Sequence, residues 1–285
     1  MVVVGLSSAE VARGSAEMNR VRLAAFGTVL GAARRAGFLV LLSAIFCVGT
    51  VGYSPTSHAQ DGVPDLNGMW RRDSFRLVPP FMFDDGVVDG VIEGFNNPIL
   101  KPWTAEILMQ KSHNEANGRI AANTMASCWP YGVPGIFDVR GIQILQLPDE
   151  VVIIYVIDHQ VRQIPLNVAH ANPVEPSWYG DSVAHFEGDT LVVDTVGFYY
   201  RPEAMVDAYG TPATEALHVV ERYRLIDDGA NLEVDVYVED PNIFQTSWSM
   251  TVEYYSDDVK LREAPCAENN RDLPKLMPTA ELPDF

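Results

Sequence analysis

The chain has 285 residues, with 38 acidic and 20 basic side chains and a formal net charge of −18 at pH 7. Such a charge repels phosphate backbones and anionic membrane surfaces, so it argues against nucleic-acid binding. It suits a soluble exported protein with a neutral or cationic small ligand.

The first 59 residues have the features of a cleaved secretory signal. An apolar run, FLVLLSAIFCVGTVG (38–52), follows a pair of arginines and is too short to span a bilayer permanently. It ends near Ser57-His58-Ala59, which fits the small-x-small pattern of signal peptidase sites. We therefore predict a signal peptide over 1–59 and export to the periplasm or medium, without stable membrane insertion after cleavage. An uncleaved anchor is the alternative.

The mature chain would span 60–285. The leader contains five of the 20 basic and two of the 38 acidic residues, which leaves 15 basic against 36 acidic residues, or −21. About 226 residues suit one large domain, and no clear linker or repeat divides the sequence.

Two cysteines remain in this mature chain, Cys128 and Cys266. In an oxidising compartment an isolated pair most simply forms one disulfide. The closed loop exceeds 100 residues, so the bond would stabilise the fold by on the order of 4–5 kcal/mol in the chain-entropy description. A catalytic thiol is the alternative.

The first predicted element with a clear pattern is a helix over 102–119, which begins with Pro102 near its first turn and ends near Gly118. A loop region rich in proline and glycine follows, including CWPYGVPG (128–135).

From Val139 onward the sequence predicts four consecutive β-hairpins, each with β-branched and aromatic runs around a Gly/Asp-rich turn. The predicted strand pairs are 139–147 with 151–166, 181–186 with 190–198, 217–226 with 231–239, and 246–256 with 259–265. A meander of this kind commonly closes into a barrel, which removes its open edges.

The start of the mature chain supports a barrel. Gly68-Met69-Trp70 opens what we expect to be the first strand, and a Gly-x-Trp at this place resembles the lipocalin and wider calycin signature. The resemblance implies that Trp70 closes one end of the barrel and that Arg262, from a last strand, packs across it. We predict a mainly β protein: an antiparallel up-and-down barrel of about eight to ten strands, with one helix and long capping loops.

A second resemblance covers most of the mature chain, from about Asp65 to Asn269. The segments CWPYGVP, DHQVRQI, PSWYGDSVAHFEGDTLVVDTVGF, ALHVVERYRL and REAPCAEN are similar to a widespread group of exported bacterial proteins that carry a WEGDTLVVDTVGF-like motif. The resemblance implies export, one β-rich domain and a Cys128–Cys266 pair. It implies no reaction.

Ionisable groups on apolar strand faces are the candidate catalytic residues, because burying them is costly unless they are paired or used. Residues two apart in a strand share a face. This alternation places Asp194 with two valines, Glu221 on an otherwise apolar face, and His159 on the face of Ile153 and Tyr155.

Burial would tune such groups for general acid–base work. We expect His159 to act as acid or base with Glu221 as its partner, and Asp194 to support them. Arg162 would stabilise an oxyanion or a substrate carboxylate if its face points inward. Alternation puts Arg162 opposite His159 and His218 opposite Glu221, so all four line one pocket only if a bulge or strand end intervenes. A purely structural role is the alternative for each group, and for Asp194 it is the favoured one.

The predicted substrate contacts are aromatic residues beside these groups and a Pro-rich loop over 165–182 that could cover the barrel mouth. They are Tyr155, His170, Trp178, Tyr179 and Tyr223. An ordered surface loop is the alternative reading of 165–182.

The sequence contains no complete motif for a serine nucleophile, a metal site or a nucleotide site. Around Ser182 the sequence YGDSVAHF lacks the final glycine of a nucleophile elbow and leads into a strand. The histidines follow no metal-binding spacing, and no glycine loop suits a nucleotide phosphate, so we expect no metal and no cofactor.

Two function classes remain. The first is a cofactor-independent lyase or isomerase that holds a small hydrophobic or aromatic molecule in the barrel and transfers protons. The second is a lipocalin-like carrier of a hydrophobic small molecule, in which the same groups only orient the ligand. The number of ionisable groups on apolar faces favours the enzyme.

Overall fold

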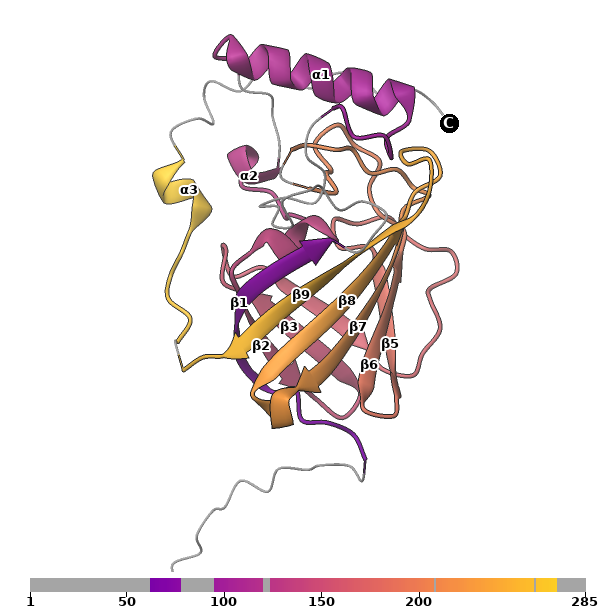
Figure 1. Ribbon diagram of the computed structural model, residues 1–285. Helices are drawn as coiled ribbons and strands as arrows, with labels where there is room; N and C mark the ends of the chain where they lie inside the picture. Colours follow the sequence, from indigo (N-terminus) through magenta and orange to yellow (C-terminus); the bar gives the residue numbers. More distant parts are fainter. Residues whose placement is uncertain (1–61, 78–94, 120–123, 208, 259, 271–285) are drawn as a thin grey trace, which may run out of the picture. The chain divides into compact units, whose positions relative to one another are not determined.

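The alternating apolar residues of the second half of the chain form an antiparallel sheet that curls into a nearly closed barrel (Figure 1). This computed structural model describes residues 62–77, 95–119, 124–207, 209–258 and 260–270. The predicted signal peptide lies outside the described residues.

Nine strands make up the sheet in these parts of the chain. They are β1 (Gly68–Leu77), β2 (Gly141–Gln146), β3 (Glu150–Tyr155), β4 (Val161–Pro165), β5 (Asp181–Glu187), β6 (Thr190–Val196), β7 (His218–Ile226), β8 (Asn231–Glu239) and β9 (Trp248–Ser256). Their order in the sheet is β4-β3-β2-β1-β9-β8-β7-β6-β5. This is the up-and-down order that the sequence predicted.

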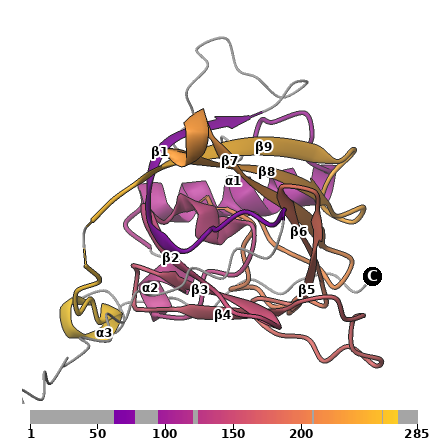
Figure 2. The ribbon, with the colours of Figure 1, turned by 90° about the horizontal axis from the view of Figure 1, so that it is seen from below.

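Strand β1 joins the two halves of this sheet. Its first residues pair with β2 and its later residues with β9, with an irregularity between Arg72 and Ser74 (Figure 2). Among the described residues, no hydrogen-bonded ladder joins β4 to β5, which are the two ends of the sheet. The backbone pairing found there is an isolated bridge between Leu166 and Ala184. We call this junction between β4 and β5 the seam of the barrel.

Burial alternates along the strands as an antiparallel barrel requires. On β8, for example, Leu232, Val234, Val236 and Val238 are fully buried, and the residues between them are less so. Trp70 also lies in the core, where its indole N–H donates to the carbonyl of Leu66 over 3.0 Å.

Helix α1 (Pro102–Ala116) lies across one end of the barrel (Figure 1). It begins at the predicted proline and ends three residues before the predicted end. Thr104 donates to the carbonyl of Ile243, and the ammonium group of Lys111 donates to the carbonyl of Gly210 over 2.5 Å. The remaining helical pieces are short: α2 (Thr124–Ser127), α3 (Cys266–Asn269) and the 3₁₀ turns η2 (Gly135–Asp138) and η3 (Asp227–Gly229).

Two predictions of strands were wrong. Segment 151–166 is two strands, β3 and β4, because Asp158 and His159 adopt left-handed backbone angles that turn the chain. The described residues of 259–265 form no strand, since β9 already pairs with β8 and β1. Arg262 is therefore an exposed residue of an irregular segment, not of a last strand.

The predicted cysteine pair is confirmed: Cys128 and Cys266 lie at disulfide distance, with their Cα atoms 5.5 Å apart. The bond ties α3 to the loop after α2. It closes a loop with a sequence separation of 138 residues.

We expect replacement of both cysteines by serine to lower the free energy of unfolding by about 4 kcal/mol, because the unfolded chain regains the freedom of the closed loop. Urea unfolding of the oxidised and reduced wild type and of the double variant measures this. The reduced wild type should match the variant, and equal midpoints for all three would contradict the expectation.

A buried carboxyl group near α1 gives a pH-dependent prediction. Burial raises the pKa of Asp207 to about 6, although its hydrogen bonds with Thr211 oppose this shift. The folded protein therefore binds this proton more tightly than the unfolded chain, and this contribution to stability declines as the pH rises from about 4 to about 6.

Asp207→Asn should remove that decline. We expect the stability of the variant relative to wild type to increase between pH 4 and pH 7 by on the order of 2–3 kcal/mol. Urea unfolding of both proteins at several pH values checks this. A difference that stays constant with pH would contradict the assignment.

Candidate functional site

An Arg–Glu ion pair lies inside the barrel, at the level of its seam. The guanidinium of Arg162 on β4 donates to both carboxylate oxygens of Glu221 on β7, over 2.9 and 2.7 Å. The side chains are 1% and 0% exposed. The same guanidinium donates to Ser182 of β5 and Thr195 of β6, over 2.7–3.1 Å.

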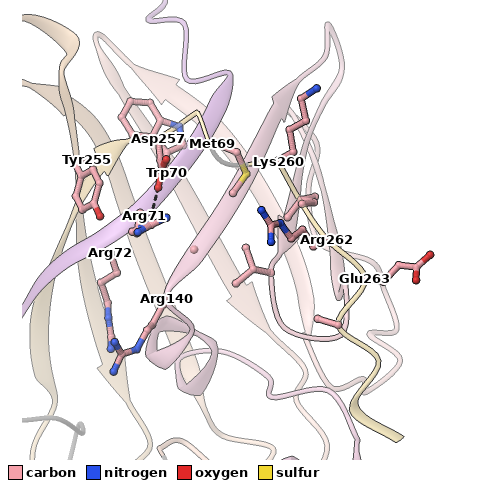
Figure 3. A pocket seen from close by; sticks show the side chains of 14 residues that line it. Met69, Trp70, Arg71, Arg72, Arg140, Tyr255, Asp257, Lys260, Arg262 and Glu263 are labelled. Atoms are coloured by element: carbon pink, nitrogen blue, oxygen red, sulfur yellow. Dashed lines mark ion pairs between the residues drawn. The ribbon is translucent and has the colours of Figure 1, made fainter. Parts of the chain in front are cut away.

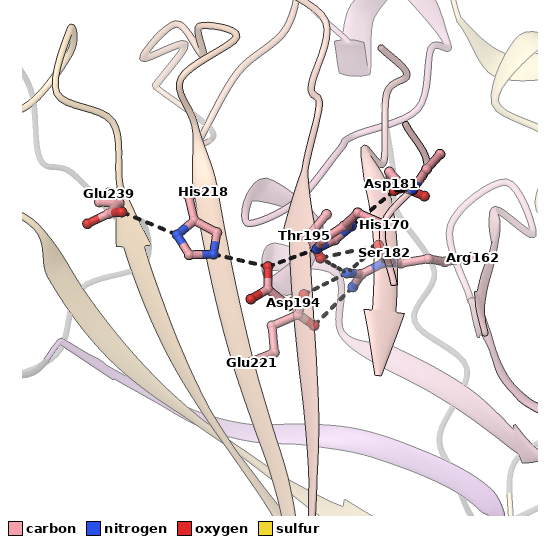
Figure 4. Close-up of polar contacts among 10 residues, drawn as sticks. Arg162, His170, Asp181, Ser182, Asp194, Thr195, His218, Glu221 and Glu239 are labelled. Atoms are coloured by element: carbon pink, nitrogen blue, oxygen red, sulfur yellow. Dashed lines mark hydrogen bonds and ion pairs between the residues drawn. The ribbon is translucent and has the colours of Figure 1, made fainter. Parts of the chain in front are cut away.

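These contacts join four strands (Figure 4). Glu221 also accepts a hydrogen bond from the hydroxyl of Tyr223 over 2.5 Å. Burial opposes the charge of Arg162, but the adjacent Glu221 carboxylate outweighs that effect, so the pKa of Arg162 lies above its ordinary value. Arg162 is therefore charged, and its guanidinium and the Glu221 carboxylate are both fully paired.

The sequence placed Glu221 inward, as the structure does, but it placed Arg162 on the wrong face. The turn at Val156–Gln160 restarts the alternation, so Arg162 pairs with Ile153 and points inward. His159 lies in this turn with φ of 48° and not on the inner face, so it does not meet Glu221 as predicted. A strand end, which was the condition for all four residues to line one pocket, does lie between His159 and Arg162. It turns Arg162 inward but leaves His159 in the turn.

A second group of ionisable side chains lies on the outer face of the barrel. His170, from the 165–182 loop, contacts Asp181 through Nδ1 (3.0 Å) and Asp194 through Nε2 (3.2 Å). His218 contacts the same oxygen of Asp194 through Nε2 (3.0 Å) and Glu239 through Nδ1 (3.2 Å) (Figure 4). We call these five residues the outer cluster.

Asp194 thus serves as the common partner of two imidazoles. All four ring nitrogens face carboxylate oxygens, and an imidazole donates from both nitrogens only when it is protonated. The side chains of His170, His218 and Asp194 are 27%, 30% and 41% exposed, so solvent reaches each of them. The structure brings together His170, Asp194 and His218 of the predicted residues, but separates them from Arg162 and Glu221. The sequence analysis missed Asp181 and Glu239.

The predicted substrate contacts also divide between the barrel interior and its surface. Tyr155 and Tyr223 are buried within the barrel, where burial raises the pKa of Tyr155 to about 12. Tyr179 stacks on Tyr155, with ring centres 6.2 Å apart. Trp178 belongs to a partly exposed aromatic group with Trp129, and its ring centre lies 5.7 Å from that of Trp129.

A groove of about 540 Å³ lies outside the core, between the start of β1 and the irregular segment after β9 (Figure 3). Its apolar lining includes Met69, Trp70, Val156 and Leu261. Its polar lining includes five basic residues: Arg71, Arg72, Arg140, Lys260 and Arg262.

The sequence did not predict this groove. Residues 69–72 form one wall, but the other lining residues lie about 70 and 190 positions further along the chain. The one local signal is the pair of arginines directly after Gly68-Met69-Trp70. Only the fold shows that Arg140 and Arg262 lie beside them.

Comparison of the sequence with models of known protein families found no match, and comparison with curated proteins found none either. No helix in the described part of the chain is long and apolar enough to cross a membrane. Within the same residues, no group of three or more His, Cys, Asp or Glu side chains is arranged to hold a metal ion.

We expect the buried ion pair to stabilise the barrel. Arg162→Met or Glu221→Met alone should lower the free energy of unfolding by about 3–5 kcal/mol, because each leaves an unpaired buried charge. The double variant should lose clearly less than the sum of the two. Urea unfolding of the four proteins gives this coupling energy.

The exposed pair Arg222–Glu187, also anchored on β7, is the matched control. The same methionine substitutions there should change stability far less than at the buried pair, because an exposed ion pair is screened by solvent and contributes little. Similar losses at the two pairs would show that burial at the seam has no special effect.

Proposed function

We propose that this protein binds a small molecule in the groove between β1 and residues 260–264. The observation that carries the proposal is the groove itself. Its volume of about 540 Å³ lies within the range of about 300–1,000 Å³ that is typical of small-molecule sites. Its lining combines apolar side chains with several convergent polar groups, which is the composition of such sites.

The barrel interior is a poorer candidate in this conformation. Arg162 and Glu221 are fully paired and have almost no contact with solvent. Tyr155, Tyr223 and Tyr254 are also fully buried. A ligand would have to displace these groups and break the ion pair. The proposal is therefore the carrier hypothesis, with the ligand on the wall of the barrel.

The lining residue Ala264 allows a direct test, because it is small and exposed at the groove. N-phenyl-1-naphthylamine, a neutral aromatic dye, should bind the wild type with one site per chain. Ala264→Trp should fill the groove and weaken this binding at least tenfold. Fluorescence titration measures both affinities.

Ala267 is also exposed, lies three residues further along on α3, and does not line the groove, so Ala267→Trp is the matched control. It should bind the dye as wild type does. Equal binding by the Ala264→Trp variant would place the site elsewhere, and no dye binding by wild type would count against the proposal.

The outer cluster supports a second candidate, the cofactor-independent lyase or isomerase. Two imidazoles share one carboxylate within reach of solvent, an arrangement that can take up and release protons. In this version of the enzyme hypothesis His170 and His218 replace His159 and Glu221 as the acid–base groups.

Base-catalysed ring opening of 5-nitrobenzisoxazole tests whether the outer cluster abstracts protons. The double variant His170→Gln/His218→Gln should lose the activity, whereas His159→Gln should keep it. No difference among wild type and the two variants would leave the binding function as the better proposal.

A further inference from the structure

The charge of the groove opposes that of the whole protein. The groove is lined by five basic and two acidic residues, a net charge of +3, whereas the chain carries −18. One quarter of the 20 basic residues of the chain thus lines a single groove. They come from β1, from the residue before β2 and from the segment after β9, so folding brings them together.

Two of these arginines are neighbours. The backbone N–H of Arg72 donates to the carbonyl of Arg140 over 2.9 Å, and both side chains line the groove (Figure 3). Arg72 is held by the carbonyl of Phe137 (3.1 Å) and the carboxylate of Asp138 (3.3 Å). Asp138 therefore partly offsets the charge of Arg72, and Arg140 adds a further positive charge to this wall of the groove.

The opposite wall contributes Arg262, whose guanidinium points toward β1 in Figure 3, while Glu263 points away. Within the described residues, no carboxylate lies within 4.0 Å of the side-chain nitrogens of Arg140 or Arg262. The acidic lining residue Asp257 is bonded to Arg71 over 2.6 Å. Arg140 and Arg262 are therefore available to a ligand.

We infer that the groove selects an apolar molecule that carries one oxyanion group, a carboxylate, sulfonate or phosphate. The oxyanion accepts hydrogen bonds from Arg140 and Arg262, and the positive charge of Arg72 adds to its attraction. The apolar part lies against Met69, Val156 and Leu261. Arginine suits this role because its planar donors match the oxygens of such groups.

This inference rests on the proposed binding function and departs from the expectation of a neutral or cationic ligand. That expectation came from the net charge, which acts on a ligand at long range and is screened by salt over about 8–10 Å. The local lining acts at contact distance. Selection of an anion is thus compatible with an acidic protein.

Two dyes of nearly the same shape provide the test. 8-Anilinonaphthalene-1-sulfonate differs from N-phenyl-1-naphthylamine by its sulfonate group. Wild type should bind the sulfonate at least tenfold more tightly at low salt, and added NaCl should reduce this preference. Arg140→Gln/Arg262→Gln should remove the preference, because it lowers the affinity for the sulfonate dye much more than the affinity for the neutral dye.

The control variant Arg119→Gln/Arg222→Gln makes the same change of charge at exposed positions outside the groove and should keep the preference. Dodecanoate and dodecyl phosphate should displace the sulfonate dye at lower concentrations than dodecan-1-ol, and the stronger competitor identifies the preferred anion.

The outcomes separate the two proposals. If wild type binds the neutral dye in the groove but shows no preference for the sulfonate, the inference of an anionic ligand is overturned and the binding function stands. If the control variant loses the preference as fully as Arg140→Gln/Arg262→Gln, net charge and not the groove determines it, and the inference fails. If neither dye binds wild type, both proposals fail.

Discussion

The bidentate ion pair between Arg162 and Glu221 is the interaction on which the architecture depends. In the described residues, backbone ladders join all neighbouring strands of the meander except β4 and β5. At that seam the guanidinium connects β4 to β5, β6 and β7. A charge in this position is tolerated only because every strong contact it needs is present. This one arginine thus joins the four strands nearest the seam.

Because the ion pair fills part of the interior, it also limits where a ligand could bind. With the interior occupied by the ion pair and three tyrosines, the groups that meet solvent are on the outer wall: the outer cluster on one part of it and the groove on another. In many lipocalin-like barrels the interior is the ligand cavity. Here side chains fill the interior, and the candidate sites lie on the surface of the barrel.

Local patterns in the sequence were sufficient for much of the fold. Alternation and turn residues predicted three of the four hairpins, a proline marked the start of α1, and the apolar neighbours of Glu221 revealed its burial. Alternation could not predict on which face His159 and Arg162 lie, because a turn inside an apolar run shifts every later side chain to the other face. The outer cluster and the groove depend on residues brought together from distant strands. Local patterns therefore indicated single members, such as Asp194 and the arginines after Trp70, but not the sites themselves.

The two strands that border the seam are sheet edges, and exposed edges invite pairing with strands of other molecules. Strand β4 carries two features that discourage this. Its last residue, Pro165, has no N–H to offer a neighbouring strand, and Arg162 points inward from its middle. An incoming strand would have to separate Arg162 from Ser182 and Thr195, so the contacts that close the barrel also keep one molecule from adding its strands to another.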